Sequence, residues 1–199
     1  SHAGVDPLAL ARAGWQAVTH GRVVSGGSTL TMQVARLLES SGTGRMSGKL
    51  RQIRVALALE RRHSKAEILD LYLRLAPYGG NLEGIRAATL AYFGKEPRRL
   101  TPAEAALLVA LPQSPETRRP DRFSLHAEAA RGRVLDRMVG AGVIAEEREA
   151  AARHEPIPSA RRPFPALAAH LADRARTEEP FRNTHRLTLD SAVQARLEK

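Results

Sequence analysis

Helix-forming signals recur along nearly the whole chain, whereas strand-forming signals are almost absent. Two capping boxes, Ser64 with Glu67 and Thr101 with Glu104, each put a hydroxyl at a helix start and a glutamate three residues later. Apolar residues repeat at helical spacing, and alternating β-branched residues are nearly missing. We therefore predict an all-α fold, with helices over about residues 7–19, 29–39, 49–62, 65–75, 82–93, 102–111, 125–139 and 145–154.

The apolar stripes also predict which side of each helix is buried. The helix over 49–62 is expected to bury Leu50, Ile53 and Leu57, and the next helix is expected to bury Ile68 and Tyr72. Prolines then cluster at positions 156, 158, 163 and 165. This cluster predicts a boundary, with one helical domain over 1–155 and an extended C-terminal linker over 156–199.

Composition narrows the class of protein. The 199 residues carry a net charge of +10 and no cysteine, so disulfides and cysteine metal sites are excluded. The seven histidines show no metal-type spacing, and no apolar run approaches the roughly 18–20 residues of a membrane span. The charge indicates an acidic partner, either nucleic acid or anionic lipid. Aromatic residues make up only 4% of the chain, which disfavours a base-stacking surface.

A segment of glycines and hydroxyls, residues 25–33 (SGGSTLTMQ), opens the second predicted helix. Glycine lets the backbone approach a ligand closely, Ser28 or Thr29 can cap the helix, and the helix start favours an anion. Basic residues follow at Arg36, Arg45, Lys49, Arg51 and Arg54. Such cations would stabilise a developing diphosphate. The alternative is an ordinary capped helix followed by a solvated basic face.

Five segments resemble, in order and spacing, the five motifs of the peptidoglycan glycosyltransferases, the lysozyme-like domain of bifunctional penicillin-binding proteins. The segments are residues 2–7 (HAGVDP), 25–33 (SGGSTLTMQ), 48–52 (GKLRQ), 67–73 (EILDLYL) and 104–115 (EAALLVALPQSP). Residues 187–190 (LTLD) with Gln194 resemble the start of the segment that leads to the transpeptidase domain. The details lean toward the 1C class, and the resemblance implies a two-lobed, lysozyme-like helical domain.

The resemblance also implies roles for individual residues. The family's catalytic glutamate would lie upstream of Ser1, so the 199-residue chain is expected to lack its base. Gln52 stands where many relatives carry a second glutamate, and its amide would orient acceptor or pyrophosphate. Glu67 would support the cleft or simply cap its helix, and Gly79 and Gly80 would line the cleft or simply form a turn. Donor sugar and pyrophosphate would be held by Ser28, Thr29, Gln33, Arg36, Arg45, Lys49 and Arg51.

These observations predict a glycosyltransferase that polymerises lipid II into glycan strands and releases undecaprenyl pyrophosphate. Its partners would be lipid II, the nascent glycan strand, the membrane surface and a C-terminal transpeptidase domain, at the periplasmic face of the inner membrane. No cofactor is required, although a divalent cation (Mg²⁺ or Mn²⁺) could bridge the pyrophosphate. The alternative is a non-catalytic module that binds lipid pyrophosphate or anionic glycan. Nucleic-acid binding rests on charge alone and is not expected.

Overall fold

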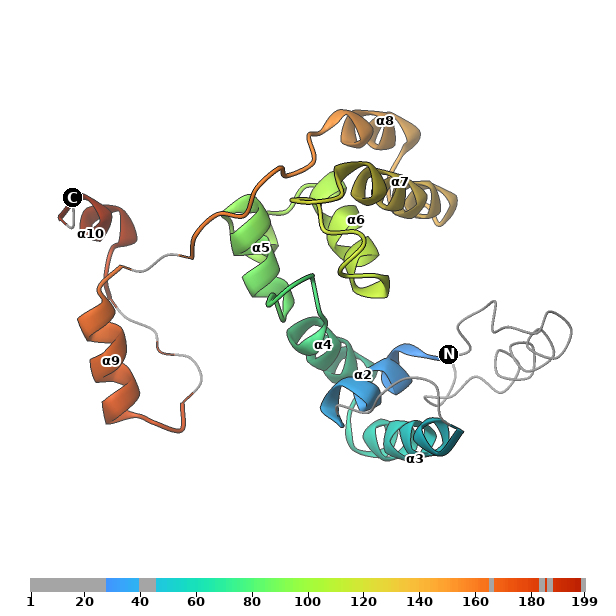
Figure 1. Cartoon of the computed structure of the whole chain (residues 1–199), viewed down its shortest axis with the longest axis horizontal. Coiled ribbons are helices and arrows are strands. Elements are labelled where there is room, and N and C mark those ends of the chain that lie inside the picture. The colour runs from blue at the N-terminus through green and yellow to red at the C-terminus, as the bar shows by residue number, and fades with distance from the viewer. Residues whose placement is uncertain (1–27, 40–45, 165–166, 183–184, 186–187, 198–199) are drawn as a thin grey trace, which may run out of the picture. The chain divides into compact units, whose positions relative to one another are not determined.

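The computed structural model describes residues 28–39, 46–164, 167–182, 185 and 188–197. The first motif-like segment, residues 2–7, the predicted helix over 7–19 and Arg45 therefore lie outside the described residues. Contacts divide the chain into a unit that ends at Arg162 and a second unit over 163–199. The described residues contain helices and no strand, so the all-α prediction is confirmed for them (Figure 1).

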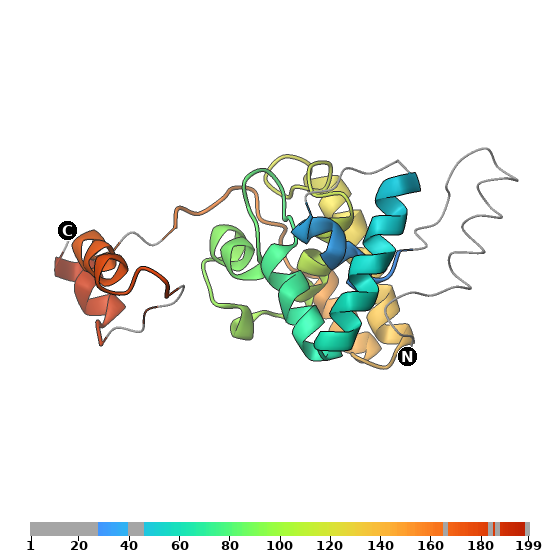
Figure 2. The same cartoon turned by 90° about the horizontal axis from the view of Figure 1, so that it is seen from below.

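The first lobe consists of α2 (Leu30–Leu38), α3 (Met46–Arg62) and α4 (Lys65–Leu75). Helix α2 packs against both α3 and α4, and it buries Met32, Val34 and Ala35 completely (Figure 2). Its N-cap is Thr29, whose hydroxyl accepts a hydrogen bond from the Met32 amide at 3.2 Å. The start of the helix is thus set by a local capping contact.

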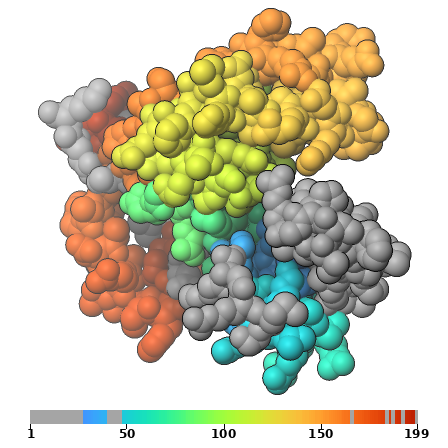
Figure 3. Space-filling model, turned by 45° about the vertical axis from the view of Figure 1, so that its right-hand side comes forward, coloured from blue at the N-terminus to red at the C-terminus, as the bar shows by residue number. Residues whose placement is uncertain are grey.

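The second lobe consists of α5 (Ile85–Phe93), η1 (Pro97–Arg99), α6 (Pro102–Ala110), η2 (Leu111–Gln113), α7 (Ser124–Gly140) and α8 (Glu146–His154). Helices α6, α7 and α8 pack on one another. The largest buried side chains at its centre include Leu107, Leu108 and Leu111. Figure 1 shows the first lobe (blue to teal) in the lower part of the view and the α6–α7 region (yellow) in the upper part, and Figure 3 shows the same separation.

A tight turn over residues 76–84 joins α4 to α5 and so connects the two lobes. An isolated bridge pairs Pro77 with Glu83, and the Tyr78 amide donates to the Leu82 carbonyl at 2.9 Å. Both Gly79 and Gly80 have positive φ, at 105° and 57°. The turn is therefore compact and closed by its own backbone.

The predicted buried face of α3 is wrong at two of its three residues. Leu50 is 63% exposed and Leu57 is 37% exposed, whereas Ile53 is half-buried and Gln52 and Ala56 are buried. A polar contact also joins α3 to α2, since the Thr31 hydroxyl of α2 donates to the Glu60 carboxylate of α3 at 2.5 Å. Periodicity does not show this hydrogen bond between two helices of the first lobe.

The C-terminal region also differs from a purely extended linker. Residues 155–162 pack on the second lobe, since the Arg162 amide donates to the Ala91 carbonyl at 2.7 Å. Beyond them, the second unit contains α9 (Ala169–Glu178) and α10 (Ser191–Leu197). The prolines predicted an extended segment, and helices as short as α9 and α10 give only a weak signal in the sequence.

Candidate substrate site

Two residues predicted to bind the substrate come together where α2 begins. The Lys49 ammonium, from the first turns of α3, donates a hydrogen bond to the Ser28 hydroxyl. Burial lowers the pKa of Lys49, and the positive charge of Arg36 lowers it further. Ser28 and Lys49 therefore lie together at the positive, N-terminal end of α2, whereas Arg36 lies in the last turn of the same helix, from which its charge still acts on Lys49.

Arg36 also faces the third helix of this lobe. Burial raises the pKa of Tyr72 on α4, and the charge of Arg36 opposes that rise. The two cations repel each other unless an anion compensates their charge, whereas the neutral Tyr72 phenol adds nothing to that repulsion. The arrangement suits a ligand that carries negative charge, such as a diphosphate.

Thr29 and Gln33 lie on the same helix start. The Thr29 hydroxyl caps α2, and the Thr29 carbonyl accepts from the Gln33 amide at 3.0 Å. The Gln33 side chain is half-buried. Thr29 thus holds the helix start in place, while Ser28 presents its hydroxyl to Lys49.

The other predicted cation of α3 has a partner at the end of α2. Arg51 Nε donates to Glu39 Oε1 at 2.8 Å, and the Arg51 side chain is 71% exposed. Its charge is partly compensated by that carboxylate, unlike the charge of Lys49. Gln52, the neighbour of Arg51, is only 6% exposed and lies in the interior of the lobe.

Glu60 is a carboxylate that connects all three helices of the first lobe. Its Oε1 accepts from the Thr31 hydroxyl of α2 at 2.5 Å and from Lys65 Nζ of α4 at 2.6 Å. No short-range pattern signals this role, because its partners lie 29 positions back and 5 positions ahead.

Glu67 caps α4, as one of its two interpretations predicted. Its carboxylate accepts from the Ser64 amide at 2.7 Å and from the Ser64 hydroxyl at 2.9 Å. These hydrogen bonds lower the pKa of Glu67. The side chain is exposed at the start of the helix. A carboxylate engaged in this way stabilises the helix start, and the role of Glu67 in supporting the cleft stays a prediction.

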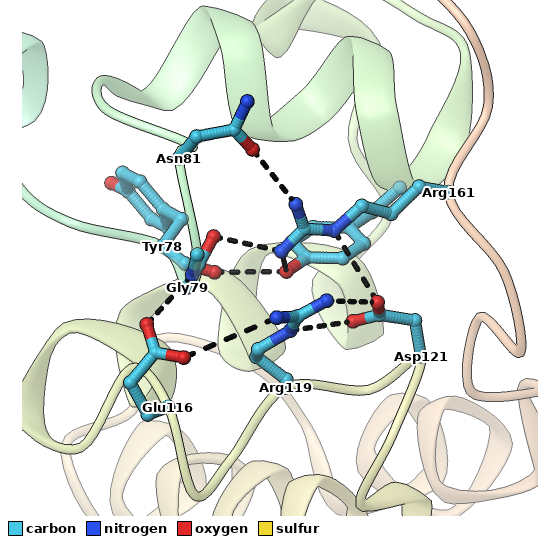
Figure 4. Close-up of polar contacts among 9 residues, drawn as sticks. Tyr78, Gly79, Asn81, Glu116, Arg119, Asp121 and Arg161 are labelled. Atoms are coloured by element: carbon cyan, nitrogen blue, oxygen red, sulfur yellow. Dashed lines mark hydrogen bonds and ion pairs between the residues drawn. The ribbon is translucent and has the colours of Figure 1, made fainter.

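Gly79 and Gly80 lie in the turn between the lobes, surrounded by charged side chains from other segments (Figure 4). The Gly79 carbonyl accepts from Arg161 Nη2 at 2.7 Å, and the Gly80 amide donates to Glu116 Oε1 at 2.7 Å. Their contacts are with the second lobe and the segment that follows α8. The prediction that they line the substrate cleft stays a prediction.

A separate cavity of about 510 Å³ lies in the second lobe. Its lining includes Phe93 of α5, Leu107 of α6, Arg131 of α7 and Ile157 of the segment after α8. None of the predicted substrate residues lines it. The size of a cavity alone does not identify the reacting centre, so we place the candidate site at the start of α2.

The chain was compared with known proteins. The Transglycosylase family matches residues 1–139. The chain is also 50% identical over 198 residues to penicillin-binding protein 1C of Escherichia coli, covering 100% of this chain and 26% of that protein. The chain belongs to the transglycosylase family.

Two further relatives place this transglycosylase domain among larger proteins. It is 37% identical over 180 residues to penicillin-binding protein 1A of Pseudomonas aeruginosa, covering 89% of this chain and 22% of that protein. A crystal structure of penicillin-binding protein 1A from Haemophilus influenzae is 27% identical, with a TM-score of 0.45, and the match covers 76% of this chain and 19% of that one. The chain therefore spans about a quarter of the length of these curated relatives.

The described residues include neither a cluster suited to a metal ion nor a helix suited to a membrane. No three of their histidine, aspartate or glutamate side chains are grouped so that they could hold a metal ion. Within the same part of the chain, no helix has the length and apolar character needed to cross a bilayer.

Proposed function

We propose that this transglycosylase domain polymerises lipid II into glycan strands and releases undecaprenyl pyrophosphate. The single observation that carries the proposal is the contact between Lys49 and Ser28 at the start of α2. A helix start, a hydroxyl and a cation, with the charge of Arg36 acting on Lys49 from the last turn of α2, support a site for a diphosphate leaving group. Family membership supplies the reaction type.

In the proposed reaction, the 4-hydroxyl of the acceptor sugar attacks the anomeric carbon of the growing chain, with inversion. The bond from that carbon to the pyrophosphate oxygen breaks, and the electron pair leaves with the pyrophosphate. Arg36 and Lys49 stabilise this charge, with Arg45 and Arg51 as further cations. Ser28, Thr29 and Gln33 hold donor sugar or phosphate, and Gln52 orients the acceptor or the pyrophosphate.

The hydroxyl proton goes to a general base. We assign this role to a glutamate upstream of Ser1, as the resemblance to the family implies. A divalent cation, Mg²⁺ or Mn²⁺, could bridge the diphosphate oxygens, and it would add to the charge that Arg36 and Lys49 supply.

The proposed partners are lipid II, the glycan strand, the membrane surface and a transpeptidase domain C-terminal to this chain. Exposed Leu38, Leu50 and Leu57 on α2 and α3, together with exposed Arg54, support contact with an anionic membrane surface. Curated relatives named penicillin-binding proteins support a place at the periplasmic face of the inner membrane.

The test measures lipid II polymerisation and lipid II binding in parallel. The 199-residue chain should bind lipid II but polymerise it about 10²–10⁴-fold more slowly than the chain carrying its native upstream residues, because general-base assistance has that size. In the longer chain, changing the upstream glutamate to glutamine should remove the gain. Efficient polymerisation by residues 1–199 alone would move the base to Glu60 or Glu67.

The charge of Lys49 is tested separately. Lys49→Ala should weaken lipid II binding about tenfold or more, because a charge-assisted hydrogen bond contributes roughly 1.5–3 kcal/mol. Lys49→Arg keeps the charge and should lose less. Lys95→Ala is the matched control, since Lys95 is paired with Glu104 at 2.8 Å in the second lobe. Equal affinity in the Lys49→Ala and Lys95→Ala variants would mean that Lys49 belongs to a solvated basic surface and does not bind the ligand.

Binding without polymerisation in the longer chain would favour the non-catalytic module.

A further inference from the structure

One guanidinium gathers contacts from three distant segments at the turn between the lobes. Arg161 Nη2 donates to the Gly79 carbonyl at 2.7 Å, and Nη1 donates to Asn81 Oδ1 at 3.2 Å. The Arg161 guanidinium also lies over the Tyr92 ring of α5, 5.6 Å from its centre. The segment that follows α8 thus reaches back 80 positions to hold the turn (Figure 4).

A second guanidinium and two carboxylates complete this cluster. Arg119 Nη2 lies 2.6 Å from Asp121 Oδ2, and the same oxygen lies 3.4 Å from Arg161 Nε. Burial alone would raise the pKa of Asp121, but Arg119 and Arg161 together hold it below its ordinary value. Asp121 is therefore ionised at neutral pH and fixes both guanidinium groups.

The turn itself is closed from the other side by Glu116 and Arg119. The Gly80 amide donates to Glu116 Oε1 at 2.7 Å. A Cβ atom at Gly79 would lie only 2.5 Å from Arg119 Cγ, so the backbone of the turn sits directly against that side chain. The cluster therefore holds both polar atoms of the one peptide group that joins Gly79 to Gly80.

The Arg119–Asp121 pair of this cluster is much more buried than the ion pair on the surface of α4. The side chains of Arg119 and Asp121 are each 11% exposed, whereas those of Arg74 and Asp70 on α4 are 72% and 60% exposed. A partly buried, multidentate guanidinium network is rigid in a way that an exposed pair is not.

We propose that Arg161 is a positioning residue for glycosyl transfer, which fixes the α4–α5 turn and so sets the first lobe, with its Ser28–Lys49 site, against the second lobe. The turn directly follows α4, where Tyr72 lies close to Arg36. Helix α4 in turn packs on α2 and contacts α5. The inference rests on the proposed function, since it concerns where that site is held.

The expected effect on KM follows from the fraction of molecules whose two lobes are set for binding. If the turn is released, only a fraction of molecules has the lobes set for binding, and the apparent affinity falls by that fraction. The loss should therefore appear in KM for lipid II, with kcat little changed.

The experiment compares Arg161→Ala, Arg161→Lys and Arg162→Ala in the chain carrying its native upstream residues. Arg162 is the matched control because its side chain is exposed and contributes none of the contacts in this cluster. Polymerisation kinetics are measured together with hydrogen exchange of the Gly80 amide. Arg161→Ala should raise KM roughly fivefold or more and speed Gly80 exchange, whereas Arg162→Ala should change neither. Arg161→Lys keeps the charge near Asp121 but loses the forked donors, and its values should lie between those of wild type and Arg161→Ala.

The outcomes separate the two proposals. A wild-type protein that fails to polymerise lipid II contradicts the proposed function, whereas Gly80 exchange still tests the cluster. A polymerising wild type with unchanged KM in Arg161→Ala overturns the positioning role, even if Gly80 exchanges faster, because the network would then be structural only. If Arg161→Ala does not fold, Arg161→Lys and Asp121→Asn carry the test, and unchanged KM in both is the overturning result.

Discussion

At the scale of single residues, the environment of Lys49 links binding to stability. Its ammonium is partly buried, lies close to Arg36 and donates to the Ser28 hydroxyl. A buried cation near another cation is unfavourable until an anion arrives. The residue therefore serves ligand binding at a cost to folding.

The first prediction concerns pH. Because burial lowers the pKa of Lys49 below 10.5, the ammonium loses its proton at a lower pH than an ordinary lysine does. Affinity for lipid II should fall as pH rises through that lowered pKa, and Lys49→Arg should abolish this alkaline loss. Between the folded and unfolded pKa values the unfolded chain binds more protons, so the contribution of Lys49 to the free energy of unfolding should rise with pH there. Titration calorimetry measures the affinity for lipid II and urea denaturation measures the free energy of unfolding, both across pH 7–10. If the two change in the same direction with pH, Lys49 is not the ligand-binding cation.

The second prediction concerns Gly79. Its φ of 105° and the 2.5 Å approach of Arg119 Cγ leave no room for a Cβ atom. Gly79→Ala should lower the free energy of unfolding by about 3 kcal/mol, since backbone strain and a clash both apply. Gly142 has a φ of 67° but no atom within 4 Å of its Cβ position. Gly142→Ala should therefore cost only about 1 kcal/mol, which urea denaturation can resolve.

At the scale of elements, the two capping boxes differ in how far their contacts reach. Ser64 and Glu67 bond only to each other at the exposed start of α4. Thr101 and Glu104 form the same local pattern at α6, but the Thr101 hydroxyl also donates to Glu155 Oε2 at 2.7 Å. One cap stabilises a helix end, and the other also anchors the segment after α8.

Replacing each cap hydroxyl should reveal this difference. Ser64→Ala should lower the free energy of unfolding by about 0.5–1 kcal/mol, within the range of exposed caps. Thr101→Ala should cost about 2 kcal/mol or more, because the half-buried carboxylate of Glu155 loses its donor as well. Thr101→Ser keeps both hydrogen bonds and should recover most of the loss. Equal costs at Ser64 and Thr101 would show that the contact with Glu155 adds nothing.

At the scale of the whole molecule, the domain extends past its last packed helix. Residues 156–162 contribute Ile157 to the second-lobe core and Arg161 to the turn between the lobes. The sequence-based boundary at residue 155 marks the end of α8, whereas the contacts place the end of the compact unit at Arg162.

Truncation tests where the domain ends. A chain ending at residue 162 should keep the melting temperature of the domain transition, whereas a chain ending at residue 155 should melt at least about 4 °C lower, since 1 kcal/mol corresponds to about 2–4 °C at this size. Differential scanning calorimetry measures both. Identical melting temperatures would restore the boundary at residue 155.

The local sequence was sufficient to predict the helices and where they begin. The caps at Thr29, Ser64 and Thr101 form hydrogen bonds within three residues, so they are readable from the printed letters. The contact between Ser28 and Lys49 joins residues 21 positions apart, and only the resemblance to a family indicated these residues together. The all-α architecture follows from the local signals, since periodicity and caps indicate where each helix forms.

Tertiary contacts decided the rest. The packing of α3 against α2 includes a hydrogen bond between Thr31 and Glu60, which are 29 positions apart, whereas periodicity favoured the exposed Leu50. The role of Arg161 depends on partners 80 and 82 positions away. Short-range pattern determines where a helix begins, because capping energy is local. It cannot determine which face is buried or which charges meet, because those depend on chain segments brought together only when the whole domain folds.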